Sequence, residues 1–269
     1  KAAARMLLTN KIVHFIELPT PRGITLSLEI LEATLENGVA SCAVKKYSGD
    51  DPDVTNGTLV YAKVSFGGNT KERKILIDGG IGVGRITKPG LEQPIGAAAI
   101  NRVPRQMITD AVIEVMEEYD YYGEIFVEIS IPEGVELAKK TFNPRLGIEG
   151  GISVLGTSGI VEPMSEEALI ASIRLEMQMH RNNGAEYLVI SPGNYGTTYL
   201  SQNFQVNLDK AVKCSNFLGE TIDMAVEMGY QGILFVSHIG KFIKAAGGIM
   251  NTHSRCADSR MEILTANAL

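Results

Sequence analysis

The sequence has few cysteines and no long apolar run, and each shortage excludes a class of protein. Its 3 cysteines stand far apart and form no CxxC pair, so they indicate neither a disulfide framework nor a zinc site. Because unpaired thiols are typical of a reducing compartment, we expect the chain in the cytoplasm. No apolar run reaches the roughly 20 residues of a membrane helix, since Lys241 and Lys244 interrupt the best candidate at residues 232–250. No stretch is typical of a cleavable signal peptide.

An excess of basic charge is also missing. The 269 residues carry a formal net charge of -6, which argues against a nucleic-acid-binding protein because a basic field supplies most of that affinity. An anionic small molecule is still compatible, because basic residues gather locally near turns. Hydrophobic residues make up 45% of the chain, enough for one large or two small domains with a sizeable core. Since the alanines after Lys1 look like the end of a helix, we expect further sequence before it.

The first half of the chain alternates apolar and polar residues with the period of a strand. Residues 25–30 and 59–66 show this alternation, and turn residues separate such runs. A helix is predicted over residues 105–119, which follow a proline and carry one apolar face. A further strand is predicted over residues 125–131. These elements predict an α+β domain with a mixed sheet over residues 1–148.

In the second half, short apolar strands alternate with helices, which predicts parallel strands joined by crossover helices. The predicted strands are residues 152–155, 187–191 and 233–237, and the predicted helices are residues 165–181, 216–227 and those from 240 onward. We therefore expect a smaller three-layer α/β domain with a mostly parallel sheet over residues 149–269. The active site is expected at the interface of the two domains.

Loops at the carboxyl ends of these strands are candidate ligand sites, because glycine permits close backbone approach and helix N-termini favour anions. The three loops are residues 156–159, 192–196 and 238–241. Their candidate cofactor-binding residues are Gly156, Thr157, Gly193 and Asn194.

A glycine-rich motif, DGGIGVG at residues 78–84, looks like the signature of common S-adenosylmethionine methyltransferases. Such a fingerprint should open a helix, but a proline and a glycine follow and oppose one. We therefore expect a strand that leads into an extended loop. Gly82 and Gly84 then either form a connection in the sheet or hold the cofactor through their backbone.

Six segments, in order along almost the whole chain, resemble the CbiD family. They are residues 49–57 (GDDPDVTNG), 80–91 (GIGVGRITKPGL), 99–105 (AINRVPR), 141–148 (TFNPRLGI), 150–161 (GGISVLGTSGIV), and 240–241 with 250–255 (GK and MNTHSR). The resemblance implies methyl transfer from S-adenosylmethionine to carbon C-1 of a cobalt-containing tetrapyrrole, cobalt-precorrin-5B. The implied product is cobalt-precorrin-6A, on the anaerobic route to cobalamin. The resemblance also implies sequence before the first alanines and, in some members, after Leu269.

Methyl transfer to carbon is an in-line displacement, so the protein must chiefly align the two reactants and exclude water. Cobalt arrives with the substrate, and we expect no metal site of the protein's own. The peripheral carboxylates of the tetrapyrrole call for basic partners. The candidate substrate-binding residues are Arg85, Lys88, Arg145, Lys241 and Arg255. Arg145 beside Pro144 is also compatible with a plain domain-connecting turn.

Three acidic residues, Asp50, Asp51 and Asp53, crowd one turn. One interpretation is a solvated turn. The other is that Asp53 holds a ribose hydroxyl or the amino group of the cofactor, and that Asp51 acts as a catalytic base.

Two histidines are further catalytic candidates. His238 follows a strand and precedes a helix start, a position typical of ligand contact, although a helix cap is the alternative. His253 lies in the polar run of residues 251–255. It either orients the substrate or moves a proton, or it belongs to a helix-capping turn.

A non-catalytic tetrapyrrole carrier of the same pathway is the alternative to the enzyme. The expected partner is the small-molecule tetrapyrrole, with S-adenosylmethionine as co-substrate, and neither nucleic acid nor a membrane. A homo-oligomer and transient contact with other cobalamin pathway enzymes are left open.

Overall fold

The structure is a computed structural model that describes residues 1–51, 53–162, 165–193, 199, 202 and 211–268. The chain divides into two compact units, Lys1–Pro163 and Met164–Leu269. The division comes later than the boundary predicted near residue 148. The reason is that residues 148–152 pair with strands of the first unit.

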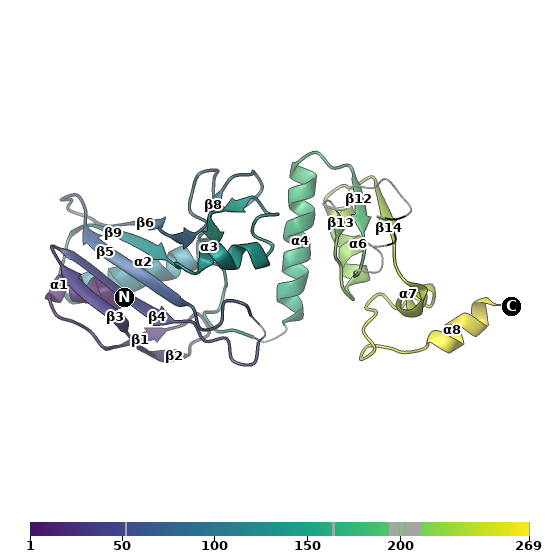
Figure 1. Cartoon of the computed structure of the whole chain (residues 1–269), viewed down its shortest axis with the longest axis horizontal. Coiled ribbons are helices and arrows are strands. Elements are labelled where there is room, and N and C mark those ends of the chain that lie inside the picture. Colours follow the sequence, from purple (N-terminus) through teal and green to yellow (C-terminus); the bar gives the residue numbers. More distant parts are fainter. Residues whose placement is uncertain (52, 163–164, 194–198, 200–201, 203–210, 269) are drawn as a thin grey trace. The chain divides into compact units, whose positions relative to one another are not determined.

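A five-stranded sheet forms the centre of the first unit (Figure 1). In spatial order its strands are β3 (Leu31–Glu36), β4 (Val39–Lys45), β5 (Leu59–Phe66), β9 (Gly123–Ser130) and β6 (Arg73–Gly79). Neighbouring strands are antiparallel, except that β6 and β9 run parallel. The predicted mixed sheet is confirmed, and β5 has the predicted bounds.

Two helices, α1 (Ala2–Thr9) and α2 (Arg102–Glu118), pack on this sheet. Helix α2 buries Val112, Val115 and Met116 almost completely, and β9 buries every second residue, so both elements contribute to one core. Burial of this apolar surface stabilises the unit by roughly 25 cal/mol per Å². A separate hairpin of β1 (Phe15–Pro19) and β2 (Thr25–Glu29) precedes the sheet strands in the chain.

Short elements begin within the glycine-rich motif and continue after it. They are β7 (Gly82–Val83), β8 (Arg85–Ile86), α3 (Gly134–Leu137), the 3-10 helix Ala138–Lys140, β10 (Ile148–Glu149) and β11 (Gly151–Ile152). The backbone at Gly82 lies so close to the Ile131 carbonyl that a Cβ at Gly82 would overlap it. Gly82 also has a φ of 78°, which favours glycine. No helix opens after the motif, as predicted, so these glycines make a connection within the first unit.

The predicted strand at residues 152–155 does not begin the second sheet, and this prediction is wrong. Ile152 pairs with Val83 in the first unit, and Val154 bridges to Ile100. A short apolar run carries no information about its pairing partner, which explains the error.

The second unit contains a three-stranded parallel sheet in the order β13 (Ala211–Val212), β12 (Tyr187–Ile190) and β14 (Gly232–Phe235). Its helices are α4 (Glu166–Asn182), α6 (Leu218–Glu227), α7 (Ile239–Ala246) and α8 (Arg260–Asn267). Ser165 caps α4, because its hydroxyl accepts a hydrogen bond from the Ala168 amide at 3.2 Å. The parallel sheet is confirmed, and α6 lies between β13 and β14 in the chain, close to the predicted helix at residues 216–227.

The described part of this unit has two layers. Side chains of α4, α6 and the sheet share one core around Met177 and Ile190. Tyr187 and Leu234 on the strands are exposed, so the described residues do not show the predicted third layer. Among the described residues, no helix is both long and apolar enough to cross a membrane.

Candidate functional site

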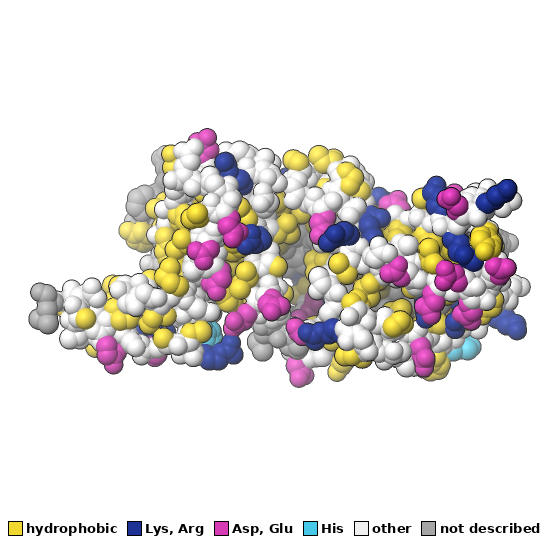
Figure 2. Space-filling view, turned by 180° about the vertical axis from the view of Figure 1, so that it is seen from behind, with side chains coloured by type: hydrophobic (Ala, Val, Ile, Leu, Met, Phe, Trp, Pro, Cys, Tyr) yellow, Lys and Arg dark blue, Asp and Glu magenta, His cyan; other side chains and the backbone are white. Residues whose placement is uncertain are grey.

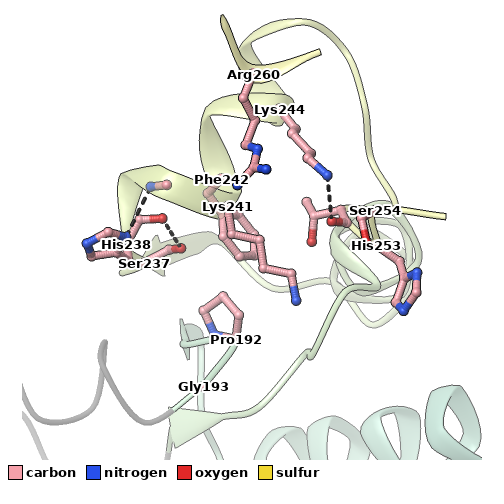
Figure 3. A pocket seen from close by; sticks show the side chains of 12 residues that line it. Pro192, Gly193, Ser237, His238, Lys241, Phe242, Lys244, His253, Ser254 and Arg260 are labelled. Carbon is pink, nitrogen blue, oxygen red and sulfur yellow. Dashed lines mark hydrogen bonds between the residues drawn. The ribbon is translucent and has the colours of Figure 1, made fainter. Parts of the chain in front are cut away.

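A cavity of about 710 Å³ lies beside the start of α7 (Figure 3). It is lined by Pro192, Gly193, Ser237, His238, Gly240, Lys241, Phe242, Lys244, Thr252, His253, Ser254 and Arg260. Strands β12 and β14 run parallel with Ile190 opposite Phe235, so the loops that follow them meet at one edge of the sheet. The structure therefore brings together four predicted site residues, namely Gly193, His238, Lys241 and His253.

His238 is the N-cap of α7. Its ring Nδ1 accepts a hydrogen bond from the Gly240 amide at 3.1 Å, and its backbone is extended. This contact matches the capping alternative, and a catalytic role for His238 stays a prediction. Lys241 follows on the same helix and extends toward Pro192 and Gly193 in Figure 3.

Lys244 is the buried charged residue of the cavity lining. Its side chain is only 3% exposed, and its ammonium donates to the Ala257 carbonyl at 2.6 Å and to the Thr252 carbonyl at 3.4 Å. Asp258 lies 3.8 Å from the same ammonium. Through these hydrogen bonds, Lys244 holds the segment of residues 252–258 against α7. No pattern in the sequence singles it out, because a lysine in a helix is ordinarily solvated.

His253 lies on this fastened segment and is exposed. Its Nδ1 accepts a hydrogen bond from the Arg255 amide at 3.1 Å, and its own amide donates to Asn251 Oδ1 at 3.1 Å. These two bonds form a compact turn that presents the ring at the cavity. Arg255 does not line the cavity, since its guanidinium forms an ion pair with Glu166 at 2.6 Å.

Thr252 is a lining residue that the sequence did not mark out as a candidate. It is 1% exposed, and its hydroxyl Oγ1 has no hydrogen-bond partner among the described residues. Such a group is unusual, because buried polar atoms nearly always find a partner. The polar run of residues 251–255 was the available signal in the sequence. From this run, however, only His253 and Arg255 were predicted to be functional.

The described lining of the cavity is basic. Arg260 is paired with Asp258 at 2.7 Å, and this contact lowers the pKa of the Asp258 carboxyl below its ordinary value. Burial raises the pKa of the nearby Cys214 thiol to about 11, which the Lys241 charge only partly opposes. Elsewhere, on the face that Figure 2 shows, basic and acidic side chains are interspersed.

The acidic turn of the first unit is held together by its own hydrogen bonds. Lys46 binds both Asp53 and Thr55, and Asp53 also accepts from the Thr55 amide at 2.8 Å. Burial raises the pKa of Asp53, but the bonds from Lys46 and Thr55 outweigh it and lower the pKa overall. Asp51 is half-buried in the same turn. The cofactor role of Asp53 and the catalytic role of Asp51 stay predictions.

The predicted basic residues of the first unit lie apart from this turn's network. Arg85 contacts the Asp78 carboxylate with two nitrogens, at 2.6 and 3.0 Å, and donates to the Gly79 carbonyl at 2.6 Å. The Arg85 hydrogen bonds lower the pKa of Asp78. Lys88 is exposed, and so is Arg145, which lies 6.0 Å from the Phe142 ring centroid. Their binding roles stay predictions.

The candidate glycines differ in what surrounds them. Gly82 and Gly84 are buried against neighbouring backbone and side chains, which matches the interpretation as a connection in the sheet. Their cofactor role stays a prediction. Around Gly156 and Gly193 the space is open, since a Cβ added at either would meet no atom within 4 Å, and Thr157 is exposed. Asn194 lies outside the described residues.

Comparison with known proteins gives consistent matches. The sequence model of the CbiD family matches residues 1–163. A relative from Ruminiclostridium cellulolyticum, named cobalt-precorrin-5B C(1)-methyltransferase, is 52% identical over 100% of this chain and 69% of its own length. A relative of the same name from Alkaliphilus metalliredigens is 47% identical over 99% of this chain and 69% of its own length.

Among solved structures, a cobalamin biosynthesis protein (cbiD) from Archaeoglobus fulgidus is similar, with a TM-score of 0.47 and 29% identity. The match covers 97% of this chain and 80% of that one. The family model matches more than half of the chain, and the curated relatives match nearly all of it. The chain therefore belongs to the CbiD family.

Proposed function

We propose that this chain is a methyltransferase that methylates C-1 of cobalt-precorrin-5B and so forms cobalt-precorrin-6A in anaerobic cobalamin biosynthesis. The observation that carries this proposal is the 52% identity over the whole chain to a relative with that printed activity. The methyl donor that we propose is S-adenosylmethionine, which supplies an activated methyl group. The tetrapyrrole brings its own cobalt, so the metal belongs to the substrate.

The cavity beside α7 is the proposed place where the chain holds a reactant. Its volume of about 710 Å³ is within the usual size of small-molecule sites. In a displacement at a methyl group, the protein contributes chiefly by positioning the reactants and excluding water. The fixed wall at residues 252–258 supports such positioning, because buried Lys244 restrains it.

His253 is the proposed orienting residue of this cavity. Its ring is exposed at the cavity, while the turn formed with Asn251 and Arg255 limits its movement. A His253→Ala protein should therefore turn over more slowly while it keeps its fold. Wild-type turnover in this variant would remove His253 from the reaction.

The donor-binding residues that we propose are Gly156 and Thr157. Gly156 has open space around it, and Thr157 is exposed, so both are accessible to a ligand. The proposed location is the cytoplasm, which the free thiols of Cys42, Cys214 and Cys256 support.

The decisive experiment is incubation of the protein with methyl-labelled S-adenosylmethionine and cobalt-precorrin-5B, followed by location of the label. We expect the label at C-1 of the macrocycle. Label at another ring carbon would overturn the regiochemistry. Tight binding of the tetrapyrrole with no label transfer would favour the non-catalytic carrier instead.

A further inference from the structure

The cavity beside α7 has a basic lining, which bears on the kind of ligand that it can bind. No described lining residue is acidic, and Arg260 is already paired with Asp258 outside the lining. Lys241 is exposed at the cavity and makes no ion pair among the described residues. The amino end of α7 adds partial positive charge at the same place. The electrostatic potential in the cavity therefore favours an anionic group.

The Thr252 hydroxyl supplies a second, independent indication. It is buried to 1% exposure, lines the cavity and has no partner among the described residues. A buried hydroxyl without a hydrogen bond destabilises a fold. Its oxygen has almost no accessible surface, so a rotation of the side chain about the Cα–Cβ bond is needed to turn the hydroxyl toward a ligand oxygen in the cavity. A carboxylate is a strong acceptor for such a donor.

We propose that the cavity binds the carboxylate-bearing edge of the tetrapyrrole substrate, with Lys241 attracting the charge and Thr252 donating a hydrogen bond. This inference rests on the proposed function, because the tetrapyrrole and its carboxylates come from it. The same positive charge opposes the sulfonium of S-adenosylmethionine, so the methyl donor binds elsewhere. Gly193, predicted to bind the cofactor, then lies beside the substrate.

The test uses cobyrinic acid, a stable cobalt corrin with free peripheral carboxylates, and its fully methylated ester as the neutral control. Binding to the whole chain is followed through the visible absorption of the corrin. Wild-type protein should bind the acid more tightly than the ester. Lys241→Met and Thr252→Val should each weaken binding of the acid about tenfold and leave binding of the ester nearly unchanged.

Two controls separate binding from folding. Thr252→Val keeps the side-chain shape and removes the unpartnered hydroxyl, so its thermal midpoint should stay equal or rise. Lys139→Met removes one positive charge from an exposed pair with Glu136 in the first unit, and it should not change binding of the acid.

Equal binding of acid and ester by the wild type, or unchanged binding in both cavity variants, would overturn the inference. Loss of S-adenosylmethionine binding in these variants, with corrin binding intact, would also overturn it and assign the cavity to the donor. The label-transfer experiment reads out the proposed function separately. A protein that transfers the methyl group but binds acid and ester equally keeps its function and loses this inference.

Discussion

Lys244→Met is the substitution that best tests how the cavity wall is built. Methionine has a similar length and keeps the apolar contacts of the buried stem. The substitution removes the ammonium that donates to the Ala257 carbonyl at 2.6 Å. The longer contact to the Thr252 carbonyl, at 3.4 Å, and the 3.8 Å approach to Asp258 contribute less.

The expected magnitude follows mainly from the short bond. A hydrogen bond to a charged donor contributes about 1.5–3 kcal/mol, so opening of the wall should become easier by about 2 kcal/mol. Because about 1.36 kcal/mol corresponds to a factor of ten, this change equals roughly a thirtyfold faster exchange of the amides that the wall protects. Removal of the ammonium also ends its desolvation cost, which opposes part of the loss in global stability.

Amide hydrogen exchange with mass spectrometry over residues 250–258 measures this opening. The informative amides are those of Thr252, Cys256 and Ala257, which donate to backbone carbonyls. Lys241→Met is the matched control, because it makes the same change on the same helix at an exposed position. Exchange in the Lys244→Met protein within about a factor of two of wild type would refute the reasoning.

Three further predictions concern other parts of the chain. Gly82→Ala should destabilise the first unit by about 3 kcal/mol or more in urea unfolding, because the added Cβ would overlap the backbone and the residue has a positive φ. Gly193→Ala is the control: the space around Gly193 is open, so its free energy of unfolding should stay within about 0.5 kcal/mol of wild type. The fold lowers the pKa of the Asp53 carboxyl below its ordinary value of 3.8. Its contribution to the free energy of unfolding is therefore fully present at a pH above 3.8, and it is lost as the pH falls through the lower pKa of the folded state. Asp53→Asn should therefore be less stable than wild type at neutral pH and show a shallower acid loss in unfolding measured against pH; parallel curves would contradict the Lys46 contact. Arg255→Met should bind cobyrinic acid like wild type, because its guanidinium pairs with Glu166 outside the cavity lining, and a clear loss of affinity would restore its predicted substrate role.

Local patterns in the sequence anticipated much of the architecture. The alternation at residues 59–66 predicted the bounds of β5, and Ser165 marked the start of α4. The loops after β12 and β14 were predicted to meet, because both strands are parallel. The third predicted loop, residues 156–159, does not belong to this sheet edge, because the preceding strand pairs with β7 in the first unit. By contrast, the strand Ala211–Val212 is too short to carry a periodic signal.

The candidate site was foreseen only in part. Gly193, His238, Lys241 and His253 were singled out from turn chemistry and position, and the fold places all four at one cavity. The role of Thr252 was not foreseen, because the lack of a hydrogen-bond partner is a property of packing.

The sequence by itself determined the family, the elements with strong periodicity and the loops that carry polar residues, because each of these depends on neighbours along the chain. Only the tertiary structure decided that residues 151–152 pair with β7, that Arg85 is engaged by Asp78, and that Lys244 is buried. These outcomes depend on pairing and burial between distant segments. The same residue types on another fold could be solvent-exposed, so spacing in the sequence does not specify them.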